Sequence, residues 1–80
     1  MKYSHQFVED YNDLIGFGLD RKTDESTIVC YLQMFSDDEL MKELIGKMSD
    51  EELDEIFSLI TRILKKYLTE PEYHRLFLKE

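Results

Sequence analysis

Residues 49–68 read SDEELDEIFSLITRILKKYL, and this stretch decides the fold class. Its large apolar side chains recur every three or four residues, which is the period of one face of an α-helix. Ser49, followed three residues later by Glu52, forms the capping-box pattern that begins helices. Acids gather at the start and bases at the end, so each group opposes the partial charge of its helix terminus. We predict a helix over 50–68. The apolar positions are Leu53, Ile56, Phe57, Ile60, Ile63, Leu64, Tyr67 and Leu68.

The segments on either side of this helix carry the same signals. Ser36 with Glu39, and Thr69 with Glu72, give two further capping boxes. They predict helices over 37–47 and 70–78. At the N-terminus, apolar residues at helical spacing predict a helix over 3–16, and Gly16 and Gly18 suit its left-handed C-terminal cap.

Residues 28–35, IVCYLQMF, are open to two interpretations. Their β-branched and aromatic content is typical of a buried strand. No other segment reads as a strand, however, and a lone strand leaves its backbone groups without partners. Thr23, an N-cap residue type, also precedes the run. We therefore predict a mostly buried helix over 24–35, with the buried strand as the alternative.

Together these segments predict one all-α domain over residues 1–80, a compact bundle of four to five short helices without a sheet. Only three Gly and one Pro interrupt the 80 residues, and 42% of the residues are hydrophobic. Large apolar side chains at this frequency argue against disorder. The N-terminus lacks the pattern of a signal peptide, and the single Cys30 fits a reducing compartment, so we expect a cytoplasmic protein.

Several classes of function lack support in the sequence. The net charge of −8 disfavours direct binding of nucleic acid, and no apolar run is long enough to cross a membrane. His and Cys residues do not occur at metal-ligand spacing. Cys30 lies in the most apolar run of the chain and is better explained as a buried hydrophobe than as a nucleophile. We predict a protein that is not an enzyme and needs no cofactor or metal.

The middle of the chain is strongly acidic, with a net charge of −9 over residues 23–55. One interpretation is that these acids serve the helix starts that fall there. The other is that they form a docking surface for a basic partner. The candidate acidic docking surface consists of Asp37, Asp38, Glu39, Glu43, Asp50, Glu51 and Asp54.

The C-terminus is unusually apolar, and chain ends fray unless they are docked. Its side chains either fold back on the helices or form a partner surface of the composition typical of interface cores. We expect a small acidic interaction or regulatory module that binds a protein, including a second copy of itself. The alternative is an acidic inhibitor that mimics nucleic acid and occupies a basic groove of a nucleic-acid-binding protein. The candidate partner surface consists of Tyr73, Arg75, Leu76, Phe77 and Leu78.

Overall fold

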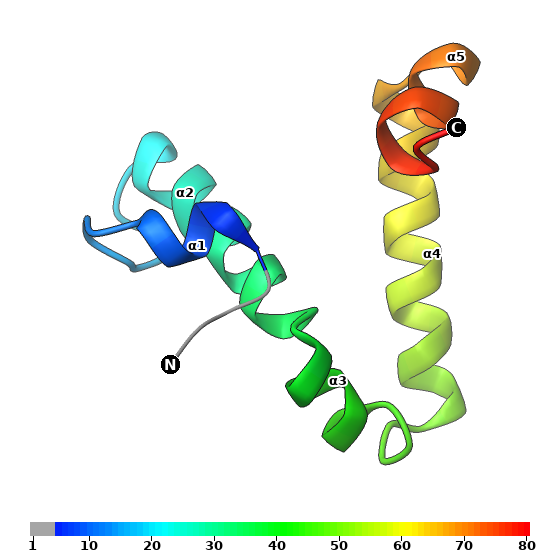
Figure 1. Cartoon of the computed structure of the whole chain (residues 1–80), viewed down its shortest axis with the longest axis horizontal. Helices are drawn as coiled ribbons and strands as arrows, with labels where there is room; N and C mark the ends of the chain where they lie inside the picture. Colours follow the sequence, from blue (N-terminus) through cyan, green and yellow to red (C-terminus); the bar gives the residue numbers. More distant parts are fainter. Residues whose placement is uncertain (1–4) are drawn as a thin grey trace. The chain divides into compact units, whose positions relative to one another are not determined.

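The computed structural model describes residues 5–80, and in this range the prediction of an all-α fold is confirmed (Figure 1). No strand occurs among these residues, so 28–35 is helical and the strand alternative is wrong. The helices are α1 (Gln6–Asp10), α2 (Arg21–Phe35), α3 (Asp38–Leu44), α4 (Asp50–Tyr67) and α5 (Glu70–Glu72), which runs on into a π-helical turn, η1 (Tyr73–Phe77).

The chain divides into two compact units, Met1–Lys47 and Met48–Glu80. The first unit contains α1, α2 and α3, and the second contains α4, α5 and η1. That residues 1–80 form a single domain stays a prediction.

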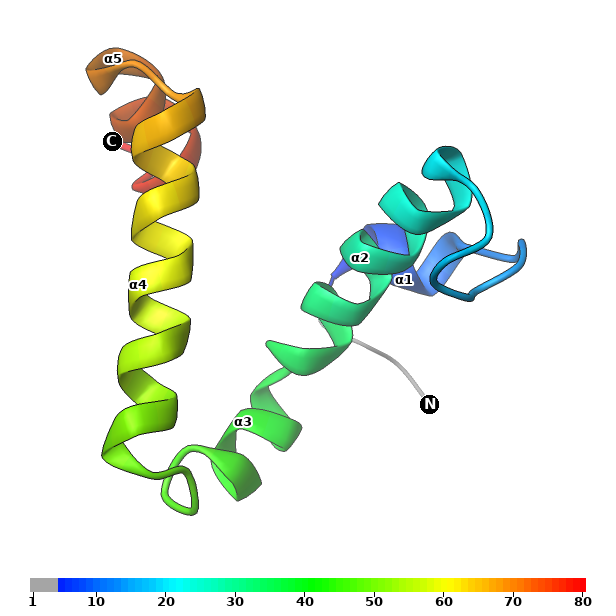
Figure 2. The same cartoon turned by 180° about the vertical axis from the view of Figure 1, so that it is seen from behind.

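In the first unit, α1 and the loop that follows it lie against α2, as Figures 1 and 2 both show. Val8, Thr27 and Cys30 are the buried residues of this packing, and the predicted burial of Cys30 is confirmed. Hydrogen bonds join the two layers: Val8 N donates to Gln33 Oε1 at 3.0 Å. Within this unit α2 is buried on one side only, whereas the sequence predicts a mostly buried helix.

The first helix is shorter than the predicted 3–16, and residues 3 and 4 lie outside the described residues. After α1 the backbone leaves the helix because side chains of α2 bind its polar groups. Thr27 Oγ1 accepts from Gly16 N and donates to Gly16 O, both at 3.0 Å. Gly18 N donates to Asp24 Oδ1 at 2.8 Å, and Gly18 has a φ of 93°, which glycine adopts without strain. The two glycines therefore belong to the loop and do not cap α1.

Two helix starts differ from the prediction by a few residues. Asp20, not Thr23, caps α2, and its carboxylate accepts from both the backbone N–H and the hydroxyl of Thr23. Ser36 does not begin the next helix, so the capping box at Ser36 was wrong. Ser36 still closes α2, and the extended conformation that a cap requires falls on Asp37, whose side chain accepts from Glu39 N.

In the second unit, the predicted capping boxes are both confirmed. Ser49 Oγ accepts from Glu52 N at 3.1 Å while Ser49 N donates back to Glu52 Oε1 at 2.9 Å, and Thr69 with Glu72 repeats this exchange at the start of α5. After Leu68 the backbone becomes extended, and α5 and η1 fold back beside the end of α4 (orange and red in Figure 1). The helix predicted over 70–78 is present, but its last part is a π-turn, with Leu78 N donating to Tyr73 O.

Candidate functional site

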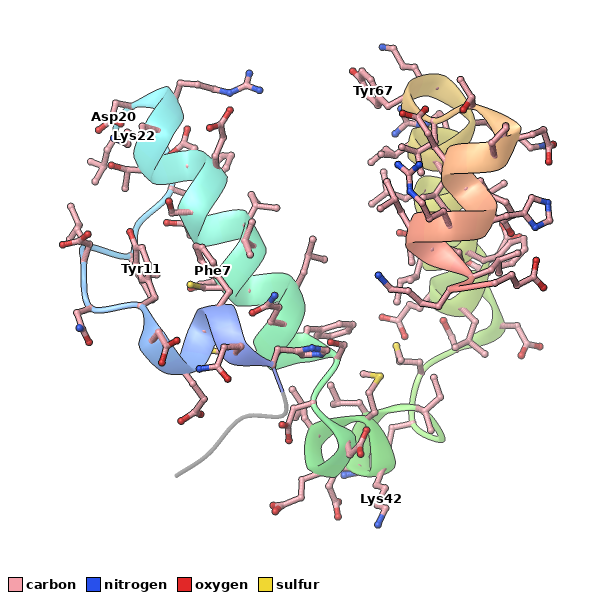
Figure 3. All side chains as sticks on the ribbon, turned by 45° about the horizontal axis from the view of Figure 1, so that its top comes forward. Phe7, Tyr11, Asp20, Lys22, Lys42 and Tyr67 are labelled. Carbon is pink, nitrogen blue, oxygen red and sulfur yellow. The ribbon has the colours of Figure 1, made fainter. Side chains whose placement is uncertain are left out.

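An uncovered apolar face runs along α4, and we call it the α4 strip: Leu53, Ile56, Phe57, Ile60, Ile63 and Tyr67. Only Ile56 of this set is half-buried, and no residue of α4 is buried. Phe57 is 71% exposed and Tyr67 is 68% exposed. Figure 3 shows Tyr67 projecting outward from the end of the helix. Large apolar side chains left in water along a whole helix mark a surface that another element covers.

Charged residues lie on the sides of α4 that point away from the strip. Asp54 and Lys65 are eleven residues apart, close to three helical turns, so they share one side of the helix. Glu55 and Lys66 share another side for the same reason. The ammonium group of Lys66 also lies 5.3 Å from the centre of the Tyr67 ring, a cation–π geometry. Each of these two sides is thus acidic near the start of α4 and basic near its end.

The residues of the C-terminal candidate surface follow one another on η1 and just after it, but they differ in exposure. Tyr73 is half-buried and lines a pocket of about 250 Å³ with Thr61, Leu64 and Leu68 of α4. Its ring stacks on Phe77 with centroids 5.5 Å apart. Tyr73 is thus the residue of the tail that faces α4 across this pocket. The other members of the predicted surface are exposed: Arg75, Leu76, Phe77 and Leu78.

The acidic candidates are divided between the two units, and most stand at helix starts. Asp37 caps α3, with Asp38 and Glu39 in its first turn, and Asp50 and Glu51 occupy the first turn of α4. Glu43 Oε2 lies 3.8 Å from Lys47 Nζ, an exposed pair that adds little stability. Asp54 differs from the rest, because it lies beyond the first turn of α4. The use of this set as a docking surface, or as a mimic of nucleic acid, stays a prediction.

A second apolar strip, on α2, is absent from the sequence-based list of candidates. Ile28, Tyr31, Leu32 and Phe35 are exposed. Their spacing of three, four and seven residues places them on one face, away from Cys30. The same spacing is visible in the sequence. The α2 strip was missed because residues 28–35 are also apolar on the opposite side of the helix, so the two faces do not differ in polarity.

Two carboxyl groups have lowered pKa values, and both take part in capping a helix start. The backbone N–H of Thr23 lowers the pKa of Asp20 below its ordinary 3.8, and the Thr23 hydroxyl adds to the effect. The backbone N–H of Thr69 likewise lowers the pKa of Glu72 below 4.5. Because a hydrogen bond to the charged form accounts for each shift, these groups serve structure and do not indicate acid–base chemistry.

Over residues 5–80, the His, Cys, Asp and Glu side chains do not come together in any group of three that could hold a metal ion. Within the same range, none of the helices has both the length and the apolar character needed to cross a bilayer. No protein-family model, curated protein or solved structure matches the chain. The α4 strip is therefore the feature on which a function can be argued.

Proposed function

We propose that this protein is an acidic protein–protein interaction module that binds its partner through the α4 strip. The observation that carries the proposal is the exposure of Phe57 and Tyr67 on a helix that keeps its apolar side chains on one face. Covering a side chain of this size is worth about 1.5–3 kcal/mol. Aromatic residues are also enriched in the cores of protein interfaces.

The shape of the strip favours a helical segment as the bound element. Side chains spaced three or four residues apart form the ridges that pack between the ridges of another helix. The acidic start and the basic end of α4 would favour one direction of the bound helix. We place this binding in the cytoplasm, where the buried Cys30 thiol remains reduced.

Site-specific photo-cross-linking in cells tests the proposal. A benzophenone side chain replaces Phe57 on the strip, and the matched control carries it at the neighbouring Ser58, which points away from the strip. We expect light-dependent protein adducts from position 57 and few or none from position 58. Equal yields at the two positions, or no adduct at position 57, would contradict the proposal.

A further inference from the structure

We infer that the pocket between the end of α4 and the C-terminal tail, α5 with η1, binds a free α-amino acid that has a large apolar side chain. The pocket lies where the tail folds back beside α4 (Figure 1). The residues that line it do not include any member of the α4 strip. Binding of an amino acid is therefore a second property of the second unit, separate from the proposed function.

The apolar part of the pocket suits one compact apolar side chain. Leu64 and Leu68 line it from the end of α4, and Tyr73 lines it from η1. All three are half-buried, and the ring of Tyr73 is also held by stacking on Phe77. The volume of about 250 Å³ lies below the roughly 300–1,000 Å³ of pockets that take drug-sized molecules, which indicates a smaller ligand.

Two opposite charges line the same pocket. Lys65 supplies an ammonium group, and Glu70 supplies a carboxylate. Among residues 5–80, Lys65 takes part in no ion pair. Glu70 Oε2 lies 3.4 Å from His74 Nε2, which places the carboxylate beside η1 and leaves Oε1 for a ligand. The pocket thus offers one unpaired cation and one carboxylate oxygen next to its apolar wall.

This combination of charges selects a zwitterion. A simple carboxylic acid is attracted by Lys65 but repelled by Glu70, and a simple amine experiences the reverse. An α-amino acid carries both groups on one carbon atom. Its carboxylate accepts from the ammonium group of Lys65, and its own ammonium group donates to Glu70, so both contacts are charge-assisted hydrogen bonds. The apolar side chain of the ligand then lies against the two leucines and the tyrosine ring.

An NMR titration of the purified full chain, followed through its backbone amide signals, tests the ligand class. We expect leucine and phenylalanine to shift the signals around the pocket. Isocaproic acid lacks the ammonium group of leucine, isoamylamine lacks its carboxylate, and glycine lacks its side chain. Each of these three compounds should bind at least about tenfold more weakly than leucine.

Two outcomes of this titration overturn the inference. The first is that neither leucine nor phenylalanine shifts the pocket signals at about 10 mM. The second is that isocaproic acid or isoamylamine binds as tightly as leucine, because the two charges then do not act together.

Substitutions on the pocket wall test the two charged contacts. Lys65→Met removes the ammonium group and keeps most of the side chain, and Lys66→Met makes the same change at the next residue, outside the pocket. Glu70→Gln is paired in the same way with Glu55→Gln. We expect at least about tenfold weaker binding of leucine in the two pocket variants and unchanged binding in the two controls. Equal affinity in a pocket variant and its control overturns the assignment, and circular dichroism checks that all four variants keep their helix content.

Discussion

The helices α2 and α4 have similar lengths, 15 and 18 residues, but different forces define them. In α4, the cap, the charges at both ends and the apolar period all agree, and each acts within four residues along the chain. In α2, the second half is apolar on almost every side, with Gln33 as its polar residue. Its buried side includes Thr27, whose hydroxyl binds the loop backbone eleven residues earlier. Local signals thus suffice to define α4 as a helix, whereas the packing of α2 depends on contacts between residues distant in the chain.

The largest expected effect on stability comes from removing a contact of α2 with a residue distant in the chain. Thr27→Val removes the hydroxyl that both accepts from and donates to Gly16, leaving two partly buried backbone groups without this partner. We expect a loss of about 1–3 kcal/mol in the free energy of unfolding of this unit. Labelling of the Cys30 thiol by DTNB should also become faster, because Cys30 is fully buried beside Thr27.

The same exchange in the other unit is the matched control. Thr61 is half-buried on α4, and Thr61→Val should change stability by less than about 0.5 kcal/mol. Chemical unfolding followed by circular dichroism measures both variants. Equal effects at the two positions would show that the bonds of Thr27 to Gly16 do not set the first unit apart.

The second-largest expected loss of stability comes from removing a local signal of α4, its N-terminal cap. Ser49→Ala removes the side-chain acceptor for Glu52 N and should cost about 0.5–2 kcal/mol. Ser58→Ala, in the middle of the same helix and on the side away from the α4 strip, is the control and should change little. Thermal unfolding monitored at 222 nm compares them. Equal melting temperatures of the two variants would show that the cap does not define the start of α4.

A smaller effect, of opposite sign, is expected at the end of the second unit. Lys79 follows η1 with a φ of 60°, a left-handed conformation that is unfavourable for a residue with a Cβ atom. Lys79→Gly relieves this strain and should raise stability by about 1 kcal/mol. Lys79→Ala removes the same charge and keeps the Cβ atom, so it should give no such gain. A gain with alanine equal to that with glycine would assign the effect to charge.

The smallest effect is a dependence on pH that compares one cap from each unit. Asp20 and Glu72 have lowered pKa values in the folded chain, so the stability each contributes is present above its ordinary value of 3.8 or 4.5. That contribution is lost as the pH falls through the lowered pKa. We expect Asp20→Asn and Glu72→Gln to flatten the loss of helix signal below about pH 4.5 in an acid titration. Unchanged titration curves in both variants would contradict this assignment.

How far the sequence predicted the structure follows from the range of each interaction. The all-α class, the span of α4 and two of the capping boxes were predicted correctly, because these features depend on residues three or four positions apart. The early end of α1 was missed, since it depends on Thr27 and Asp24 binding Gly16 and Gly18 across a loop. The cap at Asp37 was missed because Ser36 is an equally good residue type, and its place in the closing turn of α2 decides between them.

The same division applies to the candidate site. The sequence by itself determined that α4 is a helix with one apolar face and oppositely charged ends, because helical geometry turns spacing directly into position on a face. Only the tertiary structure decided which apolar residues are covered. Tyr73 of the predicted tail is half-buried and shares a pocket with α4, while Phe57 and Tyr67 remain exposed. Periodicity states which side chains share a face, but burial depends on what packs there, and that involves residues far apart in the chain.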